Sequence, residues 1–411
     1  MKYRGSRGNI QQRCHGWLMS IAAMGIGVVA QSAAADGSGQ PLALRVQDNR
    51  LVDSRGSTLQ LRGASVSGLE GGVIFGERNG IWSSSGFGDR PDFTRLGAWK
   101  LNAVRLPLNE DSWLGKTVTD MAGRVIALDG AAYRAEVRAS VAAANAAGLY
   151  VLLDLHWAAP ASFAANTQNP MMDADNSVSF WVSIANTFKD NLAVAFELYN
   201  EPYIAPLKSA DGVFAVASIE VPDHIANAII RDGGAASAYF GRSNGRFDGA
   251  VVRRPDSWQS TGYQTVIDAV RATGATNVIL CGGNHYSNDL TWWTQGAPVD
   301  PAHELAASLH AYAGGYPYNL ATDKAAVDAM LADIVSSHPL VVTEMGDEVG
   351  RDPAQFAAGV LAWADLHGYS VLAWTWNPWR GANALISDVT RGTATPGLGR
   401  TFQQWAIHHK Q

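Results

Sequence analysis

Three features of the sequence predict an α/β fold built as a single (β/α)8 TIM barrel. Short apolar segments recur along the chain, and most are separated by segments with helical periodicity. The apolar segments are continuous rather than alternating, as expected of parallel strands that are buried on both faces. Three helical segments end in glycine just before the next strand, at Gly148, Gly274 and Gly368. Glycine ends helices because it readily adopts the left-handed conformation.

The strands and helices can be placed in order along the chain. We expect eight barrel strands, at residues 59–63, 103–108, 150–156, 194–200, 278–282, 306–310, 340–343 and 371–376. We expect helices at residues 133–147, 178–190, 263–273, 324–335, 354–367 and, after the last strand, 401–409. The alternative fold is an open doubly wound sheet. It is less favoured because no Gly-x-Gly-x-x-Gly turn follows the first strand.

Three segments lie outside this pattern of strands and helices. Residues 44–46 and 51–52 flank Asp48-Asn49 and predict an N-terminal β-hairpin that closes the bottom of the barrel. Two long insertions, at residues 67–92 and 203–258, each follow a barrel strand. Loops that follow the strands lie on the catalytic face of such a barrel, so we expect both insertions to form walls or lids of a cleft. The alternative is that they are tolerated surface loops.

Residues 1–35 have the features of an export signal. They combine a positively charged start, a short apolar run at residues 17–30 and a small-residue cleavage site at residues 33–35. We therefore expect a signal peptide at residues 1–35, one catalytic domain at residues 36–411 and a secreted or periplasmic location. An uncleaved membrane anchor is the alternative, but the apolar run is short for a membrane span.

Charge and cysteine content disfavour several kinds of partner. The chain carries 31 basic and 37 acidic residues, for a net charge of −6. Because it is acidic and has no basic runs, we expect it to bind neither nucleic acid nor, after signal cleavage, a membrane. Cys14 lies within the expected signal peptide, which leaves Cys281 without a partner for an internal disulfide. The apolar neighbours of Cys281 predict a buried core residue.

Two glutamates lie where apolar strands end. Glu201 belongs to Asn200-Glu201-Pro202, where the proline cannot continue a central strand. Glu344 follows the apolar run at residues 340–343. Strand ends meet at one mouth of a parallel barrel, so we expect the two carboxyl groups to face one cavity. Two carboxyls about 5–5.5 Å apart hydrolyse glycosidic bonds with retention, whereas a wider spacing gives inversion. The alternative for either glutamate alone is a solvated loop carboxylate.

Other strand ends carry polar residues suited to a sugar. Arg105 interrupts an apolar strand and needs an acidic partner. We expect that partner to be Glu344, whose ionised form the arginine would favour. His156, His310 and Tyr312 are expected to hydrogen-bond sugar hydroxyls or the carboxylates, although each alone is more typical of a paired core group.

Four tryptophans follow two of the predicted strands. Trp374 and Trp376 close the last strand, and an indole face at a barrel mouth can stack on pyranose rings. We expect at most one of these two to face the cleft and the other to point towards the helices. Trp292 and Trp293, after the fifth strand, are predicted to form outer sugar subsites, with packing in the core as the alternative.

The ordered series of strand-end motifs resembles glycoside hydrolase family 5, the cellulase family. The resemblance spans about residues 61–388 and rests, strand by strand, on Leu61-Arg62-Gly63, Arg105, His156, Asn200-Glu201-Pro202, His310 with Tyr312, Glu344-Met345-Gly346 and Trp374. It implies that Glu201 is the general acid/base and that Glu344 is the nucleophile. It also implies that Asn200 binds the 2-hydroxyl of the sugar, that Arg105 and Tyr312 hydrogen-bond the nucleophile, that His156 and His310 shape the same subsite, and that Trp374 stacks on the sugar. Met345 stands where the family often has an aromatic residue, which predicts a change in packing.

These features together predict a secreted retaining glycoside hydrolase that cleaves β-1,4-linked glucan or a related polysaccharide, as an endo-β-1,4-glucanase does. We expect it to act as a monomer, without a cofactor or metal. β-Mannanase and exo-β-glucosidase activities are the alternatives within the family, and a non-catalytic glycan-binding barrel is a third. A metal-dependent barrel enzyme is less favoured because the sequence has no His-x-x-x-His ligand pair.

Overall fold

The structure is a computed structural model that describes residues 42–71, 74, 81–82, 86–120, 123–204, 223–237, 246–247, 250–251, 257–315, 317–347, 352–379 and 381–409. The expected signal peptide at residues 1–35 lies outside these residues, as does most of the insertion at residues 203–258. Within the described ranges, no helix has both the length and the apolar character needed to cross a membrane.

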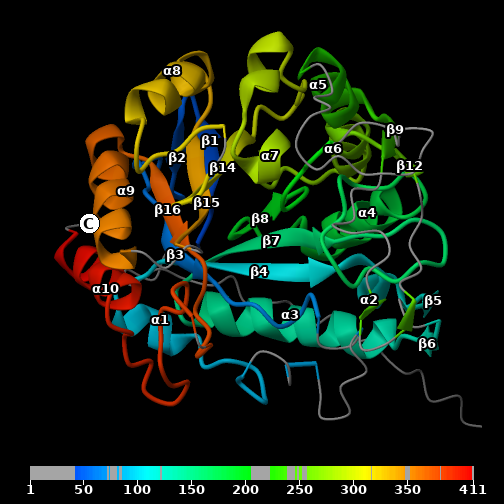
Figure 1. Ribbon diagram of the computed structural model, residues 1–411, viewed down its shortest axis with the longest axis horizontal. Helices are drawn as coiled ribbons and strands as arrows, with labels where there is room; N and C mark the ends of the chain where they lie inside the picture. Colours follow the sequence, from blue (N-terminus) through cyan, green and yellow to red (C-terminus); the bar gives the residue numbers. More distant parts are fainter. Residues whose placement is uncertain are drawn as a thin grey trace, which may run out of the picture. The chain divides into compact units, whose positions relative to one another are not determined.

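Eight parallel strands close into a barrel, and helices lie around its outside (Figure 1). Neighbouring strands follow the order β3, β4, β7, β8, β13, β14, β15, β16 and back to β3. Their bounds are Arg62–Ser65, Ala103–Asn109, Tyr150–Trp157, Val194–Glu197, Ile279–Cys281, Leu305–Tyr312, Leu340–Gly346 and Ser370–Ala373. The predicted (β/α)8 barrel is therefore confirmed, and the open sheet is wrong.

Some strand bounds differ from the prediction. β8 ends at Glu197 rather than at residue 200, and β16 likewise ends before residue 376. Beyond β8 the backbone still bonds to both neighbouring strands, through Leu198 N–H to Leu280 O at 3.0 Å and Asn200 N–H to Leu155 O at 3.1 Å. The regular ladder nevertheless stops, because the chain is approaching the turn that Pro202 requires.

The helices between the strands lie close to their predicted positions. They are α3 (Gly130–Ala146), α4 (Ser177–Phe188), α6 (Tyr263–Ala272), α8 (Lys324–Val335) and α9 (Pro353–His367), with α10 (Leu398–His408) after the last strand. The other helices are α1 (Thr94–Ala98), α2 (Glu110–Leu114), α5 (Asp223–Asp232), α7 (Asn284–Ser287) and the 3-10 helix η2 (Thr291–Gln295). Gly368 ends α9 with a φ of 72°, in the left-handed region that the sequence predicted.

An N-terminal hairpin closes the bottom of the barrel, as predicted. It is formed by β1 (Arg45–Gln47) and β2 (Arg50–Val52). Leu44 and Leu51 of this segment pack against the apolar floor of the barrel, which consists of Leu61, Ala103, Leu152, Ala195, Leu280, Ala306, Val341 and Leu372. Three further two-stranded sheets lie in the loops: β5 (Thr117–Thr119) with β6 (Val125–Ala127), β9 (Gly234–Ser237) with β12 (Ser257–Ser260), and β10 (Arg246–Phe247) with β11 (Ala250–Val251).

A polar layer lies directly above this apolar floor. Side chains alternate along a strand, so the residue two positions after an interior apolar residue also points into the barrel. The polar residues in that position are Arg105, Asp154, Glu197, Ser308 and Thr343, and all five are buried. The interior of the barrel thus changes from apolar to charged just below its mouth.

A second group of buried acids connects the loop after β4 to the loop after β7. Glu110, Asp111 and Asp173 are buried, and the Ser177 hydroxyl lies 2.5 Å from Glu110 Oε2 and 3.2 Å from Asp173 Oδ2. Lys116 Nζ lies 2.7 Å from Asp111 Oδ1. Burial raises the pKa of Glu110 well above its usual value, and the charges of Asp173 and Asp111 raise it further. Burial also raises the pKa of Asp111 to about 6.

These raised pKa values predict that the contribution of Glu110 and Asp111 to stability falls as the pH rises. Between the unfolded pKa of Glu110, near 4.5, and its higher folded pKa, the folded chain holds a proton that the unfolded chain has lost. Each pH unit in this window lowers the free energy of unfolding by about 1.4 kcal/mol. Urea unfolding at pH 5 and pH 8 isolates this contribution: over this interval the free energy of unfolding should change less favourably in the wild type than in Glu110→Gln. Asp333→Asn, at an exposed site, is the control and should show the same change with pH as the wild type.

Candidate active site

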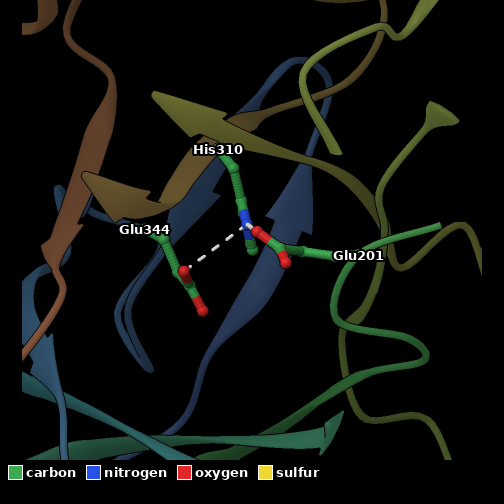
Figure 2. Close-up of side chains that lie close together, drawn as sticks. All are labelled: Glu201, His310 and Glu344. Atoms are coloured by element: carbon green, nitrogen blue, oxygen red, sulfur yellow. Dashed lines mark hydrogen bonds and ion pairs between the residues drawn. The ribbon is translucent and has the colours of Figure 1, made fainter. Parts of the chain in front are cut away.

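Glu201 and Glu344 lie close together at the mouth of the barrel, with His310 between them (Figure 2). Glu201 follows β8, whereas His310 and Glu344 lie on the adjacent strands β14 and β15. His310 Nδ1 is 2.9 Å from Glu201 Oε1 and 3.6 Å from Glu344 Oε2. One ligand atom from each of the three residues lies within 4.8 Å of the other two. The two carboxyl groups therefore face the same small space.

A β-bulge points Glu344 into the barrel. The pairing of β14 with β15 shifts register between Leu309, opposite Val342, and His310, opposite Glu344. Val342 packs in the core outside the barrel, so strict alternation would place Glu344 on that side as well. Thr343 is the extra residue of the bulge, so Glu344 points into the barrel instead. Thr343 is buried, and its hydroxyl lies 2.6 Å from Ser308 Oγ. Bulges often re-aim a side chain next to an active site.

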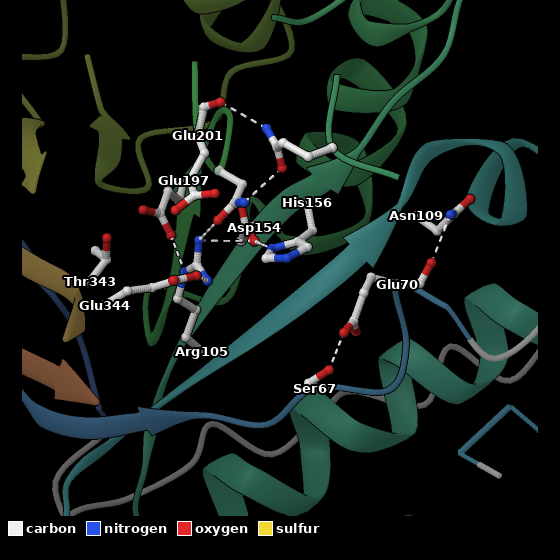
Figure 3. A network of polar contacts seen from close by, with 12 residues as sticks. Ser67, Glu70, Arg105, Asn109, Asp154, His156, Glu197, Glu201, Thr343 and Glu344 are labelled. Carbon is white, nitrogen blue, oxygen red and sulfur yellow. Dashed lines mark hydrogen bonds and ion pairs between the residues drawn. The ribbon is translucent and has the colours of Figure 1, made fainter. Parts of the chain in front are cut away.

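Arg105 lies below the carboxylates and connects four side chains (Figure 3). It is fully buried, and Nη1 donates to Glu344 Oε1 at 2.5 Å while Nη2 donates to Asn200 Oδ1 at 2.8 Å. Nε donates to Glu197 Oε2, and Nη2 lies 3.0 Å from Asp154 Oδ2. One guanidinium thus contacts three carboxyl groups.

The expected contact between Arg105 and Glu344 is present, but it only partly offsets the rise in the pKa of Glu344. Burial raises the pKa of Glu344, and the negative charge of Glu201 raises it further. His310 and Arg105 act in the opposite direction without cancelling the effect of burial. Tyr312 adds a hydrogen bond from its hydroxyl to Glu344 Oε2 at 2.6 Å, which also favours the ionised carboxylate.

His156 and Trp374 form a stacked pair near the same carboxylates. Their ring centroids are 5.4 Å apart and their planes differ by 3°. His156 Nδ1 lies 2.7 Å from Asp154 Oδ2, and burial lowers the pKa of His156. Trp376 is buried and packs edge-on against Trp99 at 4.6 Å. Of these two tryptophans only Trp374 is partly exposed, as expected. Strand alternation is not the reason, because residues two apart share a face and β16 ends at Ala373, before either tryptophan.

Both polar atoms of the Asn200 side-chain amide are hydrogen-bonded. Its oxygen accepts from Arg105, and its Nδ2 donates to Gln168 Oε1 at 3.0 Å. Gln168 also donates to the backbone oxygen of Glu201 at 2.7 Å. These bonds hold the segment that carries Glu201 against the loop after β7.

Several residues of the site were not predicted. Asp154 and Glu197 contact Arg105, and Ser308 donates to Glu197 Oε1 at 2.6 Å. Arg105 holds the pKa of Glu197 below its usual value even though burial raises it. The sequence did contain a signal for both acids, because each interrupts an apolar strand in alternation with a floor residue. Gln168 lies in a loop without any such pattern.

The prediction that Trp292 and Trp293 form outer subsites is wrong. Both side chains are buried in η2. Trp292 Nε1 donates to Gly282 O at 2.8 Å, and its ring stacks on Tyr263 with centroids 5.4 Å apart. Helix packing outside the barrel therefore accounts for this pair.

A different aromatic pair lies beside Glu201. The rings of Tyr203 and Tyr286 stack with centroids 5.0 Å apart, and Tyr286 is 45% exposed. Tyr286 lies in α7, where the φ angles of His285, Tyr286 and Ser287 are 52°, 62° and 58°. Its N–H donates to Pro202 O at 2.9 Å. Consecutive left-handed residues other than glycine are strained and occur mainly at functional sites.

A closed (β/α)8 barrel with two carboxyls facing each other at its mouth defines a class of barrel hydrolases that use paired carboxyls. The sequence confirms this class, because the cellulase family, glycosyl hydrolase family 5, matches residues 52–379. The chain belongs to this family and is a glycoside hydrolase. No match is found among curated proteins.

Solved structures with the same fold are distant in sequence. A beta-glucanase from Saccharophagus degradans is 18% identical with a TM-score of 0.59, over 89% of this chain and 93% of that one. A triple mutant of an endo-beta-1,4-glucanase from Xanthomonas axonopodis pv. citri is 21% identical with a TM-score of 0.54, over 85% and 100%. A hyperthermophilic endocellulase from Pyrococcus horikoshii is 14% identical with a TM-score of 0.58, over 91% and 100%. At these identities the likeness supports the fold.

Proposed function

We propose that this protein is a retaining endo-β-1,4-glucanase in which Glu344 is the nucleophile and Glu201 is the general acid/base. The observation that carries the proposal is the proximity of the two carboxyls, whose facing oxygens lie within 4.8 Å of one another. Retaining glycosidases hold their carboxyl groups about 5–5.5 Å apart, whereas inverting enzymes need a wider gap for a water molecule.

In the proposed first step, Glu344 attacks the anomeric carbon and forms a covalent glycosyl ester. Glu201 simultaneously gives its proton to the departing glycosidic oxygen, so that the bond to the leaving sugar breaks. In the second step, Glu201 takes a proton from water, which attacks the same carbon and releases Glu344. Each step inverts the anomeric carbon, so the product retains the β configuration.

The surrounding side chains fit this division of roles. Arg105 and Tyr312 donate to different oxygens of Glu344, which orients the carboxylate and favours its ionised form. Asn200 is held near Glu201 with its amide group directed by Arg105, and we assign it to the 2-hydroxyl of the sugar. His156 and His310 border the same subsite, and Trp374 offers a partly exposed indole for stacking.

The proposed substrate is a β-1,4-linked glucan or its oligosaccharides. The beta-glucanase from Saccharophagus degradans, which shares the fold, has a structure in complex with cellotetraose. β-Mannan and exo-action on short β-glucosides are the competing assignments. Digestion of soluble glucans and mannans, with product lengths measured over time, distinguishes them. Mixed oligosaccharides from glucan support the proposal, and single glucose units or activity only on mannan contradict it.

Proton NMR during hydrolysis tests the stereochemistry directly. The first product signal should be the β-anomer, with the α-anomer appearing later by mutarotation. An α-anomer that forms first would mean inversion, and therefore a water molecule between the two carboxyls.

The exposed position of Tyr286 near Glu201 predicts that the enzyme binds the leaving sugar as well as the sugar that is attacked. Its exposed ring lies beside the segment that carries the proposed acid, Glu201, so a sugar leaving on that side can stack on it. Tyr286→Ala should lower kcat/KM on cello-oligosaccharides by up to about tenfold, because stacking is worth about 0.5–1.5 kcal/mol. Cellobiosyl fluoride, whose leaving group cannot stack, is the control substrate and should be hydrolysed at the wild-type rate. Equal losses on both substrates would place Tyr286 outside the leaving-sugar subsite.

We further propose that residues 1–35 are removed on export, that residues 36–411 form the mature enzyme, and that it acts as a monomer that is secreted or periplasmic. The charged start and apolar run of residues 1–35 support export. The mass of the exported protein tests the cleavage point, and light scattering tests the monomer.

A further inference from the structure

The three side chains at the barrel mouth are arranged as ligands for a metal ion. Glu201, His310 and Glu344 each offer one ligand atom, and these three atoms lie within 4.8 Å of one another. Zinc binds nitrogen and carboxylate oxygen at about 2.0–2.2 Å, which places tetrahedral ligands about 3.4 Å apart. The distances from His310 Nδ1 to the two oxygens, 2.9 Å and 3.6 Å, lie on either side of that value. The ligand oxygens of the two glutamates lie within 4.8 Å of each other and must come to about the same 3.4 Å.

The other nitrogen of His310 supports this arrangement. His310 is buried, and among the described residues its Nε2 has no hydrogen-bond partner. Glu197 Oε1 lies 4.0 Å from this nitrogen. Histidines that bind zinc through one nitrogen usually direct the other N–H to a carboxylate. With Nδ1 on a metal, the proton moves to Nε2 and points at Glu197.

The local charge also favours a dication. Four carboxyl groups surround this space, those of Asp154, Glu197, Glu201 and Glu344, and the guanidinium of Arg105 contacts three of them. Arg105 binds Glu344 through Oε1, whereas the metal would take Oε2, which also accepts from Tyr312 and keeps a second lone pair. Glu201 has a side chain that is 21% exposed, so the ligands can be reached from the cleft.

We propose that Zn²⁺, or another divalent transition ion that prefers imidazole and carboxylate, binds to Glu201, His310 and Glu344 and inhibits the enzyme. The ion would occupy the space that the anomeric carbon and the glycosidic oxygen need, so it competes with substrate. The inhibition rests on the proposed catalytic function, whereas the binding of the ion does not. In this enzyme a chelator would restore activity rather than remove it.

Calorimetric titration of the protein with ZnCl₂ tests the site without relying on activity. We expect one ion per chain in the wild type and loss of that binding in His310→Asn and in Glu201→Gln. His303→Asn is the matched control, because His303 is exposed just before β14, at the opposite end of the strand, and asparagine tolerates its φ of 56°. This control should bind Zn²⁺ as the wild type does.

Two further measurements complete the test. Co²⁺ in place of Zn²⁺ should give the visible absorption of a tetrahedral nitrogen and oxygen site, and His310→Asn should abolish it while circular dichroism remains native. Zn²⁺ should raise KM for cello-oligosaccharides without changing kcat, and EDTA should reverse this. Wild-type protein that binds no Zn²⁺, or variants that keep the full stoichiometry, would overturn the proposal. Zinc binding in a protein that cleaves no glycan would leave the site in place and refute the proposed function instead.

Discussion

Glu344→Ala is expected to lower kcat by about 10⁴–10⁶-fold, the scale on which removal of a nucleophile acts. The alanine leaves space next to the anomeric carbon, and a small anion can enter it. Added azide should therefore restore turnover of an aryl β-cellobioside and give an α-cellobiosyl azide, because a single displacement inverts the carbon. Initial rates with and without azide, together with NMR of the azide product, measure both effects.

The azide product also shows whether the variant is folded. A rate that azide restores requires an intact cleft, with Glu201 and the sugar-binding residues in place. A variant that keeps more than about a tenth of wild-type kcat would exclude Glu344 as the nucleophile, since such a loss corresponds to only about 1.4 kcal/mol. A β-configured azide would mean that a second protein nucleophile had replaced it.

Much of the barrel could be predicted because its strands are continuous apolar runs with helices between them. The exact ends were harder to place, because the backbone of residues 198–200 keeps bonds to both neighbours after the regular ladder of β8 has stopped. The position of Glu344 was predicted from its place at a strand end, but alternation alone would have turned it outward. The bulge opposite Leu309 and His310 turns Glu344 inward, and no feature of the local sequence predicts that bulge.

The buried acids show a signal that was present but not used. Asp154 and Glu197 alternate with the floor residues Leu152 and Ala195, so their direction into the barrel followed from spacing alone. Their shared contact with Arg105 depends on the closure of the barrel and was not visible in one strand. Tyr286 could not have been found, because its exposure and its position beside Glu201 follow from the left-handed turn of α7 and the bond to Pro202.

Glu201→Ala should separate the two steps of the reaction. Without the acid, departure of a poor leaving group slows by about 10²–10⁴-fold, the usual contribution of general acid catalysis. A 2,4-dinitrophenyl group departs without protonation, so the first step on that substrate should be nearly unaffected. The second step loses its general base, so the glycosyl ester on Glu344 accumulates. Rapid mixing should therefore show a burst of dinitrophenolate followed by slow turnover, and mass spectrometry should show the ester.

Azide completes the test of Glu201, because the azide product of Glu201→Ala should have the opposite configuration to that of Glu344→Ala. Azide needs no general base, so it should speed the slow second step of Glu201→Ala and attack the ester from the side that water uses. The product is then a β-glycosyl azide, with retained configuration. Gln168→Ala is a useful comparison, since it removes the hydrogen bond to the Glu201 backbone and leaves the carboxyl group in place. Gln168→Ala should keep the wild-type dependence of the rate on the leaving group. If Glu201→Ala instead loses activity equally on substrates with good and poor leaving groups, Glu201 is not the acid.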